Sequence, residues 1–552
     1  MAEQDEPATM RWWGWGDPAH PPALPAHALG FLREAVGLAE RPRPPVALGS
    51  VRLPRSALQN ALGDELRGIL GSDGLREDHH ARVLHAAGKG YADLVRLRAG
   101  EPEGAPDAVL YPQRHEQLRA VLDLCTRASV AVVPFGGGTS VVGGVAPLAG
   151  EHSAVLALDM ARMGRVLSLD RESSTVTVQG GMRAPTLERH LAARALTLGH
   201  FPQSYEYVSL GGCAATRSAG QASSGYGSIE KMVLGMRLAA PAADIELQAL
   251  PASAAGPGLR QLLVGSEGTL GVISELSLRV RPAPRERIYE GVFFEDFASG
   301  AQALRALARE HALPEVARLS DEAETRMSLA LAGTGGVKGR LGRAYLGARG
   351  YSEGCLAILG FEGAPEEVAF RRGRALGLAK GFGGLAVGRS PGRAWLASRF
   401  SGPYLRDDLL TQGVMVETLE TATQWANLQA LHGAVGRAIA GALEAQGTPG
   451  LVACHVSHVY ETGASLYFTF LARQNDQDPI GQWHAVKRAA SEAIVAGGGT
   501  ITHHHAVGRD HAPWMTHEIG RGGLRALSAV KSELDPAGIM NPGKLALLSR
   551  RA

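Results

Sequence analysis

A glycine-rich segment centred on Gly137 constrains the fold of this chain more than any other feature. Pro134–Ser140 reads Pro-Phe-Gly-Gly-Gly-Thr-Ser and directly follows Val130–Val133, an apolar run that predicts a strand. Small residues after a strand expose consecutive backbone N–H groups that can surround an anion, and Thr139 and Ser140 add hydroxyl donors. The segment has neither the Lys-Ser/Thr pair of a P-loop nor the spacing of GxGxxG. Taken alone, it predicts either a phosphate cradle or an ordinary glycine turn.

Two further segments rich in small residues follow along the chain. Leu210–Gly220 contains the donors Thr216 and Ser218, and Gly265–Ile273 reads Gly-Ser-Glu-Gly-Thr-Leu-Gly-Val-Ile. One such loop is compatible with a turn. Three of them in one part of the chain indicate a large ligand that lies along the backbone, as a dinucleotide does, because glycine lets a ligand approach the main chain closely.

The pattern of apolar residues predicts a mixed α+β protein rather than a regular βαβ array. Apolar runs predict strands at Ala108–Tyr111, Val130–Val133, Ala154–Leu158, Val166–Leu169, Thr175–Gln179, Leu276–Val280 and Ser465–Leu471. Helical spacing predicts helices at Leu58–Leu70, His115–Ala128, Thr186–Arg194 and Ala422–Ala445. Near the N-terminus, Trp12, Trp13 and Trp15 stand close together, which is typical of a packed anchor.

The composition excludes several classes of protein. There are 56 basic and 54 acidic residues, and a net charge of +2 gives no reason to expect a nucleic-acid partner. The four cysteines form no CxxC pair, which is typical of reduced thiols in a cytosolic protein. Met1–Met10 is acidic and polar, unlike a secretory signal. No apolar run reaches the roughly 20 residues that span a bilayer, so we expect a cytoplasmic protein.

Thr500–Gly508, which contains three consecutive histidines, is the most unusual stretch of the C-terminal part. If it ends a strand, His503 and His505 share one face and His504 lies on the other. Histidine suits proton transfer near neutral pH. Two other interpretations remain open. A pair of histidines two residues apart can bind zinc, although Asp510 is the one acidic residue nearby, and the stretch is also compatible with a polar surface turn.

Two further side chains are candidates for chemistry, although each also has a simpler explanation. Tyr467 lies in a predicted strand whose other face carries Leu466, Phe468 and Phe470. A tyrosine in that position is commonly a packed residue with a satisfied hydroxyl. Arg406 lies in a helix-like stretch, where a single arginine commonly forms a surface ion pair.

Together these segments resemble the vanillyl-alcohol-oxidase-type FAD-binding flavoproteins and, among them, the alkyldihydroxyacetonephosphate synthase family. The narrower resemblance extends over nearly the whole chain and is weakest from Ala19 to His80 and from Asp321 to Gly350. It is carried by Met10–Gly16, Pro134–Ser140, Ser209–Gly220, Gly265–Ile273, Tyr404–Asp407, Glu420–Trp425, Tyr467 and the triple histidine. One departure is Gln203–Ser209, which begins with glutamine where the synthase pattern has aspartate.

The resemblance implies an α+β fold in which a vanillyl-alcohol-oxidase-type FAD-binding domain adjoins an α+β cap domain and a helical N-terminal segment. The implied divisions are an N-terminal tryptophan-motif segment (1–104), an FAD-binding domain (105–285), a cap or substrate domain (286–495) and a C-terminal segment that returns to the active site (496–552). FAD is the implied cofactor, bound non-covalently because Pro134–Ser140 contains no histidine. The expected FAD-binding residues are Pro134, Phe135, Gly136, Gly137, Gly138, Thr139, Ser140, Gln203, Ser209, Thr216, Arg217, Ser218, Ala219, Glu267, Gly268, Thr269, Leu270, Gly271, Val272 and Ile273.

The resemblance also implies catalytic roles. Tyr467 corresponds to an active-site proton donor or acceptor, and His503, His504 and His505 to a triple histidine around the reacting carbon. Arg406 corresponds to a substrate-binding arginine, whose guanidinium is well shaped to hold phosphate or carboxylate. The implied reaction replaces the acyl group of acyl-dihydroxyacetone phosphate by a long-chain alcohol, through an adduct at flavin N5, and gives an ether-lipid precursor. No metal is expected. A homodimer with peripheral membrane contact is implied.

Two other functions are alternatives to this one. An FAD-dependent 2-hydroxy-acid dehydrogenase, acting on D-lactate or glycolate, shares the flavin-binding half. Such enzymes carry Gly-His-x-Gly-Asp-Gly-Asn-Leu-His and a later Gly-Glu-His-Gly; here Ser457–Tyr467 keeps only His458 of the first, and the triple histidine replaces the second. The other alternative is an inactive flavin-fold binding module, which the presence of both the tyrosine and the histidines argues against.

Overall fold

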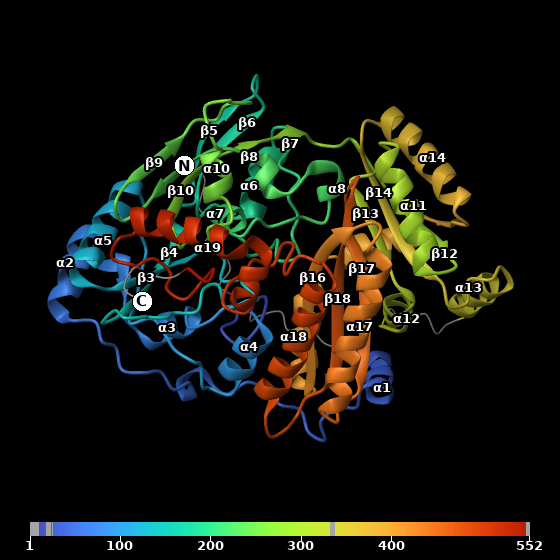
Figure 1. Ribbon diagram of the computed structural model, residues 1–552, viewed down its shortest axis with the longest axis horizontal. Coiled ribbons are helices and arrows are strands. Elements are labelled where there is room, and N and C mark those ends of the chain that lie inside the picture. The colour runs from blue at the N-terminus through green and yellow to red at the C-terminus, as the bar shows by residue number, and fades with distance from the viewer. Residues whose placement is uncertain (1–9, 18–23, 25, 332–336, 548–552) are drawn as a thin grey trace.

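The computed structural model describes residues 10–17, 24, 26–331 and 337–547. Within these residues the chain forms four β-sheets with helices on their outer faces, so the expected α+β class is confirmed. Residues 60–280, blue to green in Figure 1, lie on one side of the molecule, and residues 286–495, yellow to orange, lie on the other. The C-terminal residues, in red, cross back to the first side.

A four-stranded sheet carries the first glycine-rich segment. Its strands, in spatial order, are β1 (Leu75–Arg76), β2 (Ala108–Leu110), β4 (Val155–Asp159) and β3 (Ala131–Phe135). The last three are parallel, and helices α2 (Asn60–Leu70) and α5 (His115–Ala128) cover them through a shared apolar core. Strand β3 extends two residues beyond the predicted Val130–Val133, because Pro134 and Phe135 continue the ladder with β4.

A five-stranded antiparallel sheet follows. Its strands, in spatial order, are β5 (Val166–Asp170), β6 (Thr175–Gln179), β10 (Val272–Arg279), β8 (Val233–Ala239) and β9 (Asp244–Leu247). The associated short elements are α6 (Ala184–Ala192), α7 (Leu210–Ala215), α8 (Ser223–Tyr226), α9 (Ile229–Met232), α10 (Leu259–Leu263) and the ribbon of β7 (Leu196–Thr197) with β11 (Arg281–Pro282). The second glycine-rich segment forms α7 and its following turn, and the third leads into β10, so both loops lie at ends of this layer.

The second half of the molecule is built on a seven-stranded antiparallel sheet. Its strands, in spatial order, are β15 (Leu385–Gly388), β12 (Glu286–Phe294), β14 (Cys355–Gly363), β13 (Val316–Ser320), β17 (Gly450–Val459), β18 (Gly463–Arg473) and β16 (Val414–Gln424). Its main core is formed with α11 (Phe297–Arg309), α14 (Pro365–Gly381), α17 (Leu428–Ala445) and α18 (Pro479–Ala496). The remaining helices are α12 (Glu322–Leu331), α13 (Val337–Ala348), α15 (Arg389–Ser398) and α16 (Gly402–Thr411).

The predicted helix Ala422–Ala445 is wrong at its N-terminal end. Ala422 to Gln424 belong to β16, in register with Ser465 to Gly463 of β18, and the helix begins only at Leu428. Backbone pairing with a strand that lies far along the chain outweighs the local helical preference of these residues. This correction matters because it places Glu420 on a strand directly opposite Tyr467.

The N-terminal tryptophans are packed, as predicted. Trp15 is 2% exposed, its backbone N–H donates to the Asp407 carboxylate, and its indole N–H donates to Glu206 Oε2 at 3.1 Å. The segment therefore joins α16 in the second half to the first half of the molecule. Four α-helices follow it before β2, namely α2 and the helices α1 (Ala26–Ala35), α3 (His79–Leu84) and α4 (Tyr91–Arg98).

The C-terminal residues complete the first half of the molecule. After α19 (Met515–Leu534), Ile539 accepts a hydrogen bond from Val132 N–H at 2.8 Å, and Asn541 N–H donates to the Val132 carbonyl at 2.9 Å. The chain end thus pairs with the strand that carries the first glycine-rich segment. All four cysteines are buried free thiols, as expected. None of the described helices is long and apolar enough to cross a membrane.

Candidate active site

A cavity of about 590 Å³ lies where the two halves of the molecule meet. The glycine-rich segments line it from the first half, and strands β16, β17 and β18 line it from the second. This volume lies within the roughly 300–1,000 Å³ that is typical of ligand and cofactor sites. Loops far apart in the sequence therefore converge on one cavity.

Most of the residues expected to bind FAD line this cavity. They are Pro134, Phe135, Gly136, Gly137, Gly138, Thr139, Ser140, Gln203, Ser209, Thr216, Ser218, Ala219, Glu267, Gly268, Gly271, Val272 and Ile273. The other three, Arg217, Thr269 and Leu270, do not. Arg217 donates to the carbonyls of Val264 and Gln261, Thr269 Oγ1 donates to the Ser266 carbonyl, and Leu270 is buried in the core.

The first glycine-rich loop has no space for side chains at its centre. A Cβ at Gly136 would collide with Ser209 Oγ, and one at Gly137 would collide with the Tyr207 carbonyl. Gly138 adopts a φ of +66°, which favours glycine. The three glycines thus leave bare backbone along the cavity wall, as a cradle for a diphosphate requires. The chemistry of these residues fits the diphosphate of FAD.

Gly137→Ala is expected to weaken FAD binding at least tenfold, which corresponds to about 1.4 kcal/mol. The added methyl group would force the loop away from Tyr207 and Val208, since the Cα of Val208 lies only 3.0 Å from where this Cβ would stand. The ratio of flavin to protein after gel filtration measures the effect. Gly164→Ala is the matched control, since a Cβ there meets its nearest atom at 3.5 Å. Equal flavin content in the two variants would contradict the assignment of the cradle.

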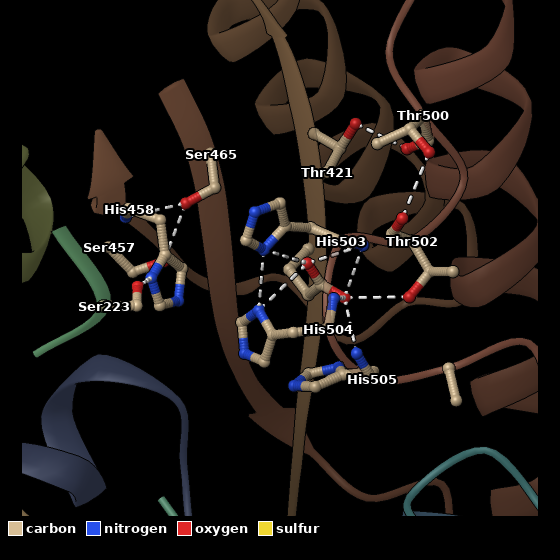
Figure 2. A network of polar contacts seen from close by, with 12 residues as sticks. Ser223, Thr421, Ser457, His458, Ser465, Thr500, Thr502, His503, His504 and His505 are labelled. Carbon is tan, nitrogen blue, oxygen red and sulfur yellow. Dashed lines mark hydrogen bonds and ion pairs between the residues drawn. The ribbon is translucent and has the colours of Figure 1, made fainter. Parts of the chain in front are cut away.

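The triple histidine does not end a strand, which corrects the sequence-based expectation. Residues 501–505 form bends and irregular backbone, because one buried carboxylate gathers their N–H groups (Figure 2). Glu420 accepts hydrogen bonds from the backbone N–H groups of His503, His504 and His505 at 2.7–2.8 Å, and from Thr502 Oγ1 at 2.8 Å. Because three consecutive N–H groups point to one carboxylate, the chain bends around it. The side chains of residues 503–505 therefore do not alternate between two faces as they would in a strand.

Glu420 was not recognised from the sequence as part of the site. It is 1% exposed and lies on β16, a strand whose end was predicted as helix. Burial by itself would raise the pKa of the carboxyl group, but the adjacent histidines, His504 first, hold that pKa well below its usual range. The carboxylate is therefore charged, and charge-assisted hydrogen bonds of this kind are the strong ones.

The three histidines have different surroundings. His504 and His505 line the cavity. His503 lies behind them, where its Nε2 is 2.5 Å from the Tyr460 hydroxyl and its Nδ1 is 3.0 Å from Nδ1 of His504. Burial lowers the pKa of His503 to about 4 and that of His505 to about 3. Nδ1 of His505 is buried and has no hydrogen-bond partner among the described residues.

Tyr467 of β18 lines the cavity between two histidines. Its ring stacks on His455 at 4.8 Å and meets the edge of His505 at 5.4 Å. Burial raises the pKa of its hydroxyl to about 12, with Glu420 and Glu417 acting in the same direction. The phenol is therefore protonated at neutral pH and can donate a proton or a hydrogen bond.

A buried ion network supports His455, and the sequence did not predict it. Glu324 Oε1 lies 2.9 Å from His455 Nδ1 and accepts from Arg318 Nη2 at 2.8 Å. Burial alone would raise the pKa of Glu324, but Arg318 and His455 lower it to about 2. Arg318, Glu324 and His455 come from β13, α12 and β17, respectively. None of them belongs to a recognisable motif, so the sequence gives no sign that they are in contact.

Arg406 is not a surface residue. Its side chain is 15% exposed and lines the cavity from α16. Nη1 donates to the carbonyl of Lys89, and Nε lies 3.8 Å from Asp407 Oδ1. Nη2 is buried and has no hydrogen-bond partner among the described residues. A buried guanidinium with a free donor is suited to an anionic ligand group.

The same cavity also has an apolar wall. Leu32, Leu409, Val416 and Leu471 line the cavity and pack together in one hydrophobic cluster, against which Met327 and Leu405 also pack. The residues come from α1, α16, β16, β18 and α12, so only the folded chain brings them together. The site thus combines a backbone cradle, an arginine, titratable rings and a contiguous apolar surface.

Comparison with known proteins identifies the family. The FAD binding domain family matches residues 106–246, and the FAD linked oxidases, C-terminal domain family matches residues 283–545. The alkyldihydroxyacetonephosphate synthase of Dictyostelium discoideum is 35% identical over 488 residues, covering 87% of this chain and 80% of that protein. The synthase of Trypanosoma brucei brucei is 34% identical and covers 97% of this chain and 92% of that protein. A solved alkyldihydroxyacetonephosphate synthase structure superposes with a TM-score of 0.83 at 30% identity, covering 97% of this chain and 99% of that one. The chain therefore belongs to the alkyldihydroxyacetonephosphate synthase family of FAD-dependent enzymes.

Proposed function

We propose that this enzyme forms an ether bond by exchanging the acyl group of acyl-dihydroxyacetone phosphate for a long-chain alcohol. The bond between the substrate carbon and the acyloxy oxygen breaks, and a fatty-acid carboxylate leaves. A bond forms between the same carbon and the oxygen of the alcohol, which loses its proton. The exchange has no net oxidation or reduction, so it needs no external electron acceptor.

The observation that carries this proposal is the set of residues that line the cavity between the two halves of the molecule. Next to the glycine cradle it contains the Arg406 guanidinium and the rings of Tyr467 and His505, and it continues onto the apolar wall. A small 2-hydroxy acid has no alkyl chain that could pack against an apolar wall of this kind. A long alkyl chain is stabilised there by roughly 0.8 kcal/mol per buried CH₂. The dehydrogenase alternative is accordingly not favoured, and the similarity to synthases over most of the chain agrees.

The roles of the residues follow from their surroundings. Arg406 binds the substrate phosphate through its free Nη2 donor. His505, whose Nδ1 has no hydrogen-bond partner in the described part of the chain, removes a proton from the carbon next to the ketone. Tyr467 donates to the departing acyloxy oxygen, because its hydroxyl is protonated at neutral pH. FAD, when bound, would supply the reactive flavin ring that the exchange requires.

The manner of cofactor binding and the assembly of the enzyme are part of the same proposal. FAD is bound non-covalently, because the cradle Pro134–Ser140 offers no nucleophilic histidine or cysteine. The enzyme acts as a cytoplasmic homodimer that touches membranes peripherally to exchange lipid substrates with them. Release of intact FAD on acid precipitation tests non-covalent binding. Light scattering measures the oligomeric state, and flotation with vesicles measures membrane contact.

The first experiment is product analysis by mass spectrometry. FAD-loaded enzyme is incubated with acyl-dihydroxyacetone phosphate and hexadecanol. We expect the alkyl ether and one equivalent of free fatty acid, and we expect a His505→Ala variant that retains FAD to form neither. Absence of the ether, together with bleaching of the flavin by D-lactate or glycolate, would instead establish the dehydrogenase.

A further inference from the structure

Three histidines from two separate segments form a compact cluster beside the cavity. His458 of β17 is 3% exposed, and its ring stacks on His503 at 4.8 Å and lies 5.0 Å from His504 (Figure 2). One metal-ligating nitrogen of each of the three residues lies within 4.8 Å of those of the other two. This grouping differs from the His503 and His505 pair that the sequence suggested as the zinc alternative, since His505 is not part of the cluster.

The two nearest nitrogens have the spacing of metal ligands. Nδ1 of His503 and Nδ1 of His504 are 3.0 Å apart. Two imidazole nitrogens on one tetrahedral zinc ion are about 3.3 Å apart, given Zn–N bonds of about 2.0–2.1 Å. Coordination by both nitrogens therefore needs a shift of only a few tenths of an ångström.

A buried carboxylate lies next to these two nitrogens. Glu420 Oε2 lies 3.3 Å from Nδ1 of His504 and 3.6 Å from Nδ1 of His503. A buried cation is tolerated where a charge pairs with it, and Glu420 supplies that charge. Ser223 Oγ, 2.5 Å from His458 Nδ1, fixes the orientation of the third imidazole, in the way that outer partners orient metal-ligating histidines.

Both Nδ1 atoms can also become free of hydrogen, as metal coordination requires. The contact between the two Nδ1 atoms places a hydrogen on one of them. For coordination, this hydrogen moves to Nε2 of the same ring, so the imidazole stays neutral and no net proton is lost. In His503 the Tyr460 hydroxyl, 2.5 Å from Nε2, can accept that hydrogen as readily as it donates its own.

From these contacts we infer that His458, His503 and His504 bind one divalent transition-metal ion, for which Zn²⁺ is the probe, and that the bound ion inhibits the enzyme. Inhibition follows because His504 lines the cavity next to Tyr467, at a ring separation of 5.9 Å, so the ion places a fixed charge against the reacting groups. The inhibitory effect rests on the proposed ether-forming function, whereas binding of the ion does not.

Competition of metal-free, FAD-loaded enzyme against a chromophoric zinc indicator tests the binding. We expect one zinc ion per chain, with an X-ray absorption spectrum of three imidazoles and one carboxylate oxygen. His458→Ala is expected to lower zinc affinity at least tenfold, and His504→Gln serves the same purpose if the first variant loses its flavin. His517→Ala, at an exposed position of α19, is the matched control and is expected to bind zinc like the unmodified chain.

Rate measurements test the inhibition separately. Saturating zinc is expected to lower the rate of ether formation at least tenfold, and a chelator is expected to restore it. Failure to bind zinc, or equal binding by the His458 and His504 variants and the His517 control, would overturn the site. Stoichiometric binding without loss of rate would overturn the inhibitory role alone. If the metal-free enzyme formed no ether, the proposed function would be wrong. The zinc-binding measurement would still show whether the metal site exists.

Discussion

Tyr467→Phe is expected to lower the rate of ether formation by about 10²–10⁴-fold, the usual contribution of a positioned proton donor, while FAD remains bound. The variant removes one hydroxyl from a ring that is held by stacking on His455 and by the edge of His505. Those ring contacts do not involve the hydroxyl, so the aromatic ring keeps its place. Product formation under saturating substrate, with flavin content measured on the same sample, gives the result.

The kinetic form of this loss separates a chemical role from a structural one. If Tyr467 donates a proton, kcat falls and KM changes little, because an interaction made only in the transition state has been removed. Tyr345→Phe, at an exposed position of α13, is the matched control and is expected to keep full activity. Activity of Tyr467→Phe within threefold of the unmodified enzyme would exclude Tyr467 as the donor.

Glu420→Gln is expected to have the largest effect on stability and to abolish activity. The amide oxygen can take the place of Oε1, which accepts from the backbone N–H groups of residues 503–505, but the NH₂ group then stands where Oε2 accepts from His503 N–H, so two donors face each other. Removing the charge from several hydrogen bonds and leaving one buried donor without an acceptor together cost about 3 kcal/mol. Chemical denaturation of the FAD-loaded protein measures this change in the free energy of unfolding.

The loss of activity has a geometric cause. Without the carboxylate, the bends that carry His504 and His505 relax, and a displacement of about 1 Å in a reacting group can cost about 10²-fold in rate. Glu461→Gln, in the exposed turn between β17 and β18, is the control and is expected to change neither stability nor rate. Wild-type stability in Glu420→Gln would show that the histidine segment holds its shape by other contacts.

The sequence by itself determined the elements whose structure is locally encoded. The helix His115–Ala128 and the strand Thr175–Gln179 have the predicted boundaries, since periodic apolar residues and nearby turn residues specify them. The glycine-rich segments were also recognisable, because bare backbone can be read directly from a run of small residues. The resemblance of these segments to one family then assigned roles in the active site to Tyr467, Arg406 and the histidines. The local sequence around those residues is equally compatible with packing, a surface ion pair or a surface turn.

Only the tertiary structure decided how the site is assembled. Pairing with β18 turned Ala422 to Gln424 into strand, and the same pairing placed Glu420 beneath residues 503–505, whose N–H groups it gathers into bends. His458 joins the histidine cluster from another strand, and the apolar wall is drawn from five separate elements. The physical reason is that a buried charge or cavity depends on contacts between residues far apart in the chain, whereas local propensity and periodicity report only on neighbours.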